Sequence, residues 1–169
     1  YAAYADATSP RRFLVIHCVS LITGLLALLF FRCVLRMRAV HAAVFLSLLT
    51  AACYLILFVF GSAPAGTNAR AWLCIGPLSL QLTEIAKVLA AAAMALAISD
   101  TDHSGKARLL RSFAILAANG VFLAALGELG TLLVLALVYA CLLFVFCPDR
   151  TELRRATLLK MLGAVAVIL

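Results

Sequence analysis

Charged residues are scarce in this chain of 169 residues, of which only 12% are Asp, Glu, Lys or Arg and only seven are acidic. Soluble domains carry about twice that share of charge. Hydrophobic residues make up 66% of the chain, and the mean hydropathy is +1.16. The composition therefore excludes an ordinary soluble domain and favours a helical membrane protein.

Motifs for most kinds of catalytic and binding chemistry are also missing. The six cysteines form no CxxC pair, and the three histidines have no metal-ligand spacing, so we expect neither a metal nor a cofactor. The chain has no phosphate-binding glycine loop and no nucleophile elbow. The net charge is +7, but the basic residues lie in short segments beside apolar runs. We therefore expect lipid head groups, and no nucleic acid, as their partners.

Long apolar runs fill most of the chain. A helix needs about 20 mostly apolar residues to cross about 30 Å of hydrocarbon. The sequence predicts an all-α fold, a polytopic transmembrane helical bundle in one domain over residues 1–169. About five full spans and a truncated sixth are expected, at 13–31, 40–60, 78–98, 112–126, 129–146 and 157–169. Residues 99–111 are predicted to form a loop. Because the sixth run stops after about thirteen apolar residues, we expect the chain to be part of a longer protein.

Basic residues cluster in alternate loops, which predicts the topology. Cytoplasmic loops of membrane proteins accumulate Lys and Arg. Three clusters are separated from one another by two spans each: Arg32, Arg36 and Arg38; Lys106, Arg108 and Arg111; and Arg150, Arg154, Arg155 and Lys160. These loops are predicted to be cytoplasmic. The segment 61–77 has one basic residue and the GELG turn at 127–130 has none, so both are predicted to lie outside.

Three polar residues interrupt the third apolar run, Gln81, Glu84 and Lys87. Their spacing of three places them on one broad face of a helix. An isolated ion at bilayer depth is costly, so we predict that Glu84 and Lys87 form a buried pair facing the bundle. Three interpretations stay open: a purely structural pair, a Lys87 that snorkels to the interface, or a pair that borders a polar cavity near the outer leaflet. Small residues at 86, 90, 93 and 97 of the same run predict close packing against a neighbouring helix.

Two patches of this sequence are typical of one family. Residues 68–89, NARAWLCIGPLSLQLTEIAKVL, resemble the pattern N-G-A-x-R-W-I-x-x-G followed by Q-P-S-E-x-x-K. Residues 126–135, LGELGTLLVL, resemble Q-P-D-L-G-T followed by an apolar helix. The matching positions are Trp72, Gly76, Gln81, Glu84, Lys87, Leu129, Gly130 and Thr131, with Glu128 at the Asp position. With these motifs in this order, the chain resembles the FtsW/RodA/SpoVE (SEDS) family of membrane peptidoglycan glycosyltransferases over about residues 10–160, as a partial chain.

The chain departs from the family pattern at several positions. Leu82 and Gly127 replace two prolines, and Thr83 replaces a serine. Ala71 takes the place of the Arg that precedes the Trp, with Arg70 one residue earlier. Each departure puts ordinary family activity in doubt.

The resemblance implies a polymerase of lipid II, the undecaprenyl-diphosphate-linked disaccharide-pentapeptide. It would act in cell division, cell shape or sporulation, in the bacterial cytoplasmic (inner) membrane, with a class B penicillin-binding protein as partner. The family fold has about ten helices, of which this chain would cover the second to the start of the seventh. The acid proposed as the family's general base lies in a later outer loop, within a P-E-x-x-T-D-F motif that this sequence does not contain. No catalytic residue is therefore assigned here.

The candidate residues for substrate binding or structure are Arg70, Trp72, Gln81, Glu84, Lys87 and Glu128. Cationic groups are needed opposite a departing diphosphate, and Lys87 and Arg70 are the candidates. Trp72 is expected either to anchor at the membrane interface or to stack on a sugar. Two other functions stay open: a membrane transporter or flippase of a lipid-linked precursor, in which Glu84 and Lys87 exchange partners, and a non-catalytic division scaffold.

Overall fold

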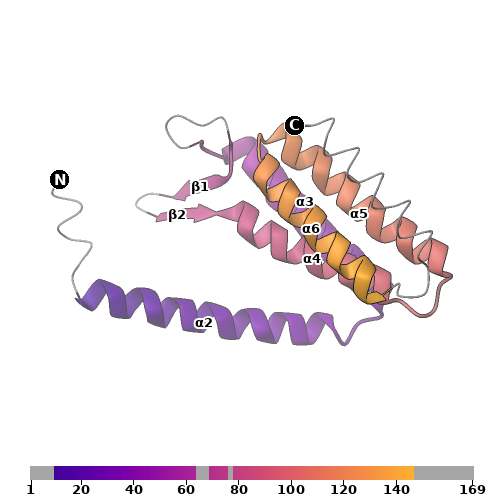
Figure 1. The fold of residues 1–169 in the computed structure, drawn as a ribbon. Helices are drawn as coiled ribbons and strands as arrows, with labels where there is room; N and C mark the ends of the chain where they lie inside the picture. The colour runs from indigo at the N-terminus through magenta and orange to yellow at the C-terminus, as the bar shows by residue number, and fades with distance from the viewer. Residues whose placement is uncertain (1–9, 64–68, 76–77, 147–169) are drawn as a thin grey trace. The chain divides into compact units, whose positions relative to one another are not determined.

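The computed structural model describes residues 10–63, 69–75 and 78–146 (Figure 1). It divides into two units, Tyr1–Arg38 and Ala39–Leu169, and each is treated by itself. The first unit contains helix α2 (Pro10–Val34). The second contains α3 (Ala39–Phe60), β1 (Trp72–Ile75), β2 (Leu78–Gln81), α4 (Leu82–Ser99), α5 (Gly105–Ala125) and α6 (Leu129–Phe146).

Four of the described helices, α3 to α6, are long and apolar enough to cross a membrane. The chain is therefore a multi-pass membrane protein with a helical bundle. Helix α2 covers the first predicted span, although its apolar part among the described residues, Leu21–Val34, is shorter than the other four. The sixth predicted span, 157–169, lies outside the described residues.

Two of the predicted spans match their helices closely, and two need correction. Helices α3 and α6 agree with the predictions of 40–60 and 129–146. The third span does not begin as a helix, because Leu78–Gln81 forms a strand and α4 starts at Leu82. The predicted loop 99–111 is also wrong in its second half. Helix α5 begins at Gly105 because the Ser104 hydroxyl accepts a hydrogen bond from the Ala107 N–H at 3.4 Å, which caps the helix start.

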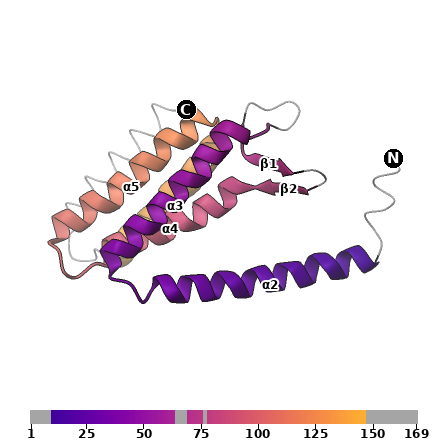
Figure 2. The ribbon, with the colours of Figure 1, turned by 180° about the vertical axis from the view of Figure 1, so that it is seen from behind.

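Helix α4 is the central helix of the second unit. It packs against α3 along most of its length and also contacts α5 and α6, whereas α3 and α5 contact each other little. Helix α6 lies in front of α3 in Figure 1 and behind it in Figure 2. The small residues predicted for close packing are buried: Ala86, Ala90, Ala93 and Ala97. That prediction is confirmed, because the absence of large side chains lets the α3 backbone approach.

Buried hydrogen bonds join α5 to the helices beside it. The Tyr54 hydroxyl of α3 donates to Asn119 Oδ1 of α5 at 2.9 Å. On the next helix, Tyr139 of α6 lies within hydrogen-bond distance of the Ser112 hydroxyl at 3.3 Å. In lipid, helices associate through packing and such polar contacts, because lipid tails are as apolar as Leu. These bonds therefore fix how α5 sits against α3 and α6.

Candidate functional site

A short hairpin holds two of the predicted site residues opposite each other. Strands β1 and β2 are antiparallel, and Trp72 pairs with Gln81 in their register. On the other edge of β1, Trp72 forms a bridge with Ser62, whose N–H donates to the Trp72 carbonyl oxygen at 2.8 Å. Both Trp72 and Gln81 are partly buried. The hairpin therefore positions the Trp72 and Gln81 side chains directly before α4 begins.

The loop that carries Arg70 is hydrogen-bonded to the turn between α5 and α6. The Arg70 N–H donates to the Leu126 carbonyl oxygen at 3.0 Å. The next residue, Ala71, is 1% exposed, and its carbonyl oxygen accepts from the Leu82 N–H at 3.2 Å. The Arg70 side chain is exposed, so the basic group lies on the open side of the loop and a methyl group fills the buried position. The two motif patches therefore meet at one end of the bundle.

The turn between α5 and α6 depends on Gly127. Its φ of 76° lies in the left-handed region, which glycine adopts without a steric penalty and proline cannot adopt at all. The Gly127 N–H donates to the Ala124 carbonyl oxygen at 3.1 Å, and the Glu128 N–H donates to that of Leu123 at 2.8 Å. This pair of bonds is the Schellman arrangement that ends a helix. The Gly127 that replaces the family's proline therefore allows a turn that proline could not form.

Glu128 lies immediately before α6 and is engaged with that helix. Its Oε2 accepts a hydrogen bond from the Thr131 hydroxyl at 3.0 Å. The side chain is partly buried. A carboxylate at the start of a helix is stabilised by the positive end of the helix dipole. In this structure one carboxylate oxygen of Glu128 therefore helps to begin α6.

Glu84 and Lys87 form the predicted ion pair, with Lys87 Nζ 2.8 Å from Glu84 Oε1. The prediction that the pair is buried is wrong for the described residues, because the Glu84 side chain is 54% exposed and that of Lys87 is 20% exposed. The neighbours Thr83 and Ala86 point into the bundle instead. Small residues occupy the buried face of α4, and the bulky ion pair lies to the side of that face.

Thr83 is a buried residue that is not among the site residues predicted from the sequence. Its side chain is 0% exposed, and its Oγ1 has no hydrogen-bond partner among the described residues. It lies one turn before Lys87, at the position of the Ser in the family pattern. Two sequence signals point to it: it is a hydroxyl residue inside an otherwise apolar helix face, and it stands at the Ser position of the motif.

A second polar cluster lies where α4 ends and α5 begins, at the other end of these helices. Asp100 is 4% exposed, and its Oδ2 lies 2.6 Å from His103 Nδ1 and 3.5 Å from Arg111 Nη1. Burial alone would raise the pKa of Asp100. The hydrogen bonds from the Asp102 N–H and from His103, with the charges of His103 and Arg111, outweigh it and hold the pKa below its usual value. The sequence predicts a cytoplasmic loop with a basic cluster here, but not the buried Asp100.

No group of three or more His, Cys, Asp or Glu residues that could hold a metal ion occurs among residues 10–63, 69–75 and 78–146. The end of the bundle with the two motifs instead carries the cations of Arg70 and Lys87 and the indole ring of Trp72. It also carries the carboxylates of Glu84 and Glu128, each of which accepts a hydrogen bond. Such a set is suited to binding an anionic, sugar-bearing ligand at the membrane surface.

Comparison with protein-family models matches residues 2–169 to the FTSW_RODA_SPOVE family, described as "Cell cycle protein". The match extends over nearly the whole chain and includes both motif patches. No curated protein and no solved structure matches the chain.

Proposed function

The chain belongs to the FtsW/RodA/SpoVE family of cell cycle proteins, and from this membership we propose that it forms part of a peptidoglycan polymerase. The substrate is lipid II, and the site is the end of the bundle formed by the β1–β2 hairpin, the start of α4 and the α5–α6 turn. The protein acts in the bacterial cytoplasmic membrane, in division, shape or sporulation, with a class B penicillin-binding protein as partner.

The hydrogen bond between Arg70 and Leu126 is the observation that carries this proposal. Residues 70–87 and 127–131 are far apart in the sequence, and each resembles a motif of the same family. One bond of 3.0 Å brings the two together on the same end of the second unit. Residues that act on a single ligand must lie close together, so this arrangement supports one shared binding site.

In the proposed reaction, a sugar hydroxyl displaces undecaprenyl diphosphate from the anomeric carbon with inversion. Negative charge builds up on the diphosphate as its bond to carbon breaks. Cations placed against that charge lower the barrier because they stabilise the transition state more than the ground state. Arg70 is exposed, and the Lys87 ammonium has two donors left after its bond to Glu84. These two residues would bind the leaving group.

Trp72 and Gln81 would bind the sugar portion of the substrate. An indole ring offers an apolar face for a sugar ring, and a Gln side chain offers one acceptor and two donors for hydroxyl groups. Their pairing across β1 and β2 places both side chains at the same level of the hairpin. The proton acceptor for the attacking hydroxyl is not assigned to a described residue, because Glu84 and Glu128 are already paired.

The proposal is tested with the full-length protein, labelled lipid II and a gel that resolves glycan strands. Arg70→Gln and Lys87→Met should each lower the rate roughly 100-fold to 1,000-fold, the range seen when one group that stabilises developing charge is removed. Lys106→Gln removes an equal charge at the other end of the bundle and serves as the control. Normal rates in both variants would refute the assigned roles. Lipid II binding without glycan synthesis would instead support a flippase or a scaffold.

A further inference from the structure

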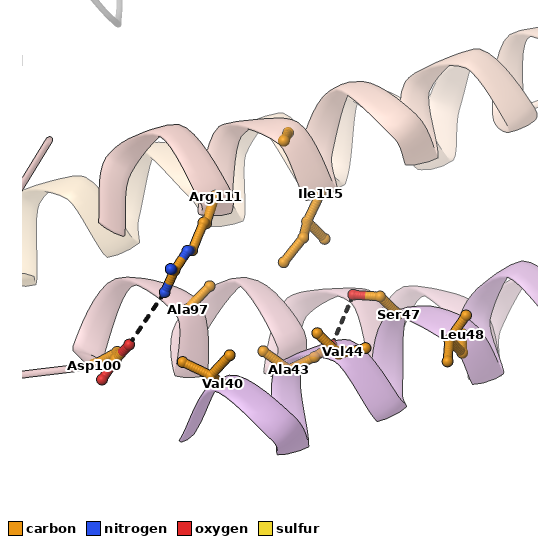
Figure 3. Close-up of a pocket in the computed structure, with 10 residues that line it drawn as sticks. Val40, Ala43, Val44, Ser47, Leu48, Ala97, Asp100, Arg111 and Ile115 are labelled. Carbon is orange, nitrogen blue, oxygen red and sulfur yellow. Dashed lines mark hydrogen bonds and ion pairs between the residues drawn. The ribbon is translucent and has the colours of Figure 1, made fainter. Parts of the chain in front are cut away.

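A half-open cavity of about 450 Å³ runs between α3, α4 and α5 at the end of the bundle opposite the motif patches (Figure 3). Its walls are almost entirely apolar, with side chains such as Val44, Leu48 and Ile115. A second cavity of about 250 Å³ adjoins it, because both are lined by Ser47, Ala114 and Ile115. Together they form a groove, called here the α3–α5 groove.

The groove exists because α3 and α5 both pack on α4 but contact each other little. The α5 side of the groove is low because short side chains line it. Ala114 lines both cavities, and Ala118 lines the second. Helices α3, α4 and α5 are all apolar enough to span the membrane. The open side of the groove therefore faces a hydrophobic surrounding.

One end of the groove is charged. Arg111 and Asp100 line the first cavity there, and Figure 3 shows Arg111 reaching across to Asp100. This contact is long, at 3.5 Å, and the Arg111 side chain is 42% exposed. A guanidinium has five N–H donors, so most of those of Arg111 are accessible to a further anion. Asp100 follows directly after α4, so the pair lies at the border of the apolar span, where phosphates of lipid head groups lie.

The length of the groove fits one leaflet of a bilayer. Along α5 it extends from Arg111 to Phe122, which is about 16 Å at 1.5 Å per residue. The hydrocarbon core is about 30 Å thick, so one leaflet contributes about 15 Å. An acyl chain that enters beside Arg111 would thus extend along the groove as far as Tyr54 and Phe122, whose rings are stacked 5.6 Å apart.

We propose that the α3–α5 groove is a binding site for an anionic phospholipid of the cytoplasmic leaflet. The phosphate of its head group binds the Arg111 guanidinium, and one acyl chain fills the groove as far as Phe122. The site lies on the side that the charge pattern predicts to be cytoplasmic. It is distinct from the site proposed for lipid II and does not depend on that function.

The test measures lipid retention by the protein with native mass spectrometry, after incubation with equal amounts of phosphatidylglycerol and phosphatidylcholine that have identical acyl chains. The wild-type protein should retain phosphatidylglycerol in preference. Arg111→Gln should reduce that preference roughly fivefold, the usual weight of one basic residue at an anionic membrane surface. Lys106→Gln removes the same charge nearby from a residue that does not line the groove, and it should leave the preference unchanged.

A second pair of variants tests the apolar part. Ala114→Leu fills the groove and should reduce the retention of both lipids, whereas Ala117→Leu places the same side chain on an exposed position of α5 that lines neither cavity. If Arg111→Gln fails to fold, Arg111→Lys replaces it as a variant that keeps the charge. The loss of lipid retention in Ala114→Leu then still tests the proposal. Equal effects of the two charge variants, or unchanged retention in Ala114→Leu, would overturn the proposal. So would a wild-type protein that retains no lipid, because another helix would then occupy the groove.

Discussion

The N–H of Arg70 donates a hydrogen bond to the carbonyl oxygen of Leu126 across 3.0 Å. The donor belongs to the loop that precedes β1, and the acceptor ends α5. A bond between main-chain atoms does not depend on the Arg70 side chain, so the loop is positioned while the guanidinium stays available to a ligand. The shape of the α5–α6 turn therefore determines where Arg70 and Trp72 lie relative to α6.

Gly127→Ala should destabilise the turn that accepts this bond. Gly127 has a φ of 76°, in the left-handed conformation, which costs a residue with a Cβ about 1–2 kcal/mol. The thermal midpoint of the purified protein in detergent should therefore fall. Gly130→Ala is the matched control, because a Cβ there meets no atom within 4 Å and Ala favours the helix. The two variants should shift the midpoint in opposite directions, and equal shifts would contradict the role of Gly127.

Glu84 and Lys87 should show only weak coupling in a double-mutant cycle with Glu84→Gln and Lys87→Met. Glu84 lies in the first turn of α4, at the border of the span, and its side chain is 54% exposed, so water screens the pair and its contribution should be less than about 1 kcal/mol. Removing one partner from a buried pair would instead cost a few kcal/mol. The free energy of unfolding of the four proteins measures the coupling. A coupling above about 2 kcal/mol would contradict the weak interaction expected of an exposed pair.

The helices of this fold were predictable because an apolar run of span length has few alternatives. Helices α3 and α6 match their predicted limits within one residue. The strand β2 was not predicted, because LSLQ runs directly into the apolar helix α4, and an alternation of Leu with Ser and Gln over four residues is too short to separate it from that helix. Only its pairing with β1 distinguishes the two, and that pairing depends on residues outside any local window.

The candidate site was predictable in its members but not in its arrangement. The pairing of Trp72 with Gln81 and the bond from Arg70 to Leu126 join residues that no helical or strand period relates. The sequence does not predict the exposure of Glu84, because either of two faces of α4 could point into the bundle. One face carries the small residues, and the other carries Gln81, Glu84 and Lys87. Close packing against α3 favours the small face, since a Glu and a Lys would hold the helices apart.

Asp100 should make stability depend on pH in the acid range. Its pKa in the folded protein is below the usual 3.8, so its contribution is fully present above pH 3.8 and is lost as the pH falls through the lowered value. The difference in thermal midpoint between the wild type and Asp100→Asn should thus shrink below about pH 4. Asp102→Asn, in the same turn but exposed, controls for the loss of a negative charge. A difference that grows on acidification would contradict the lowered pKa.

The loop between α4 and α5 should be cytoplasmic, and the β1–β2 hairpin should lie outside. The basic residues Lys106, Arg108 and Arg111 motivate the assignment. In intact cells, a membrane-impermeant maleimide should label the natural Cys74, which is exposed in β1, and the signal should vanish in Cys74→Ser. A cysteine introduced by Asp102→Cys in that background should react only after the membrane is opened. Labelling of it from outside would reverse the topology.

The 169-residue chain alone should make no glycan strands from lipid II. General-base catalysis needs a proton acceptor within hydrogen-bond reach of the attacking hydroxyl, and the acceptor implied by the family resemblance is a carboxylate. Two carboxylates are described at the end of the bundle with the motifs, and both are engaged, Glu84 with Lys87 at 2.8 Å and Glu128 with Thr131 at 3.0 Å. Purified chain, labelled lipid II and a gel for glycan test this, with an active lipid II polymerase as the positive control. Glycan made by the chain alone would point to one of these two carboxylates, and Glu84→Gln and Glu128→Gln would then identify which of them accepts the proton.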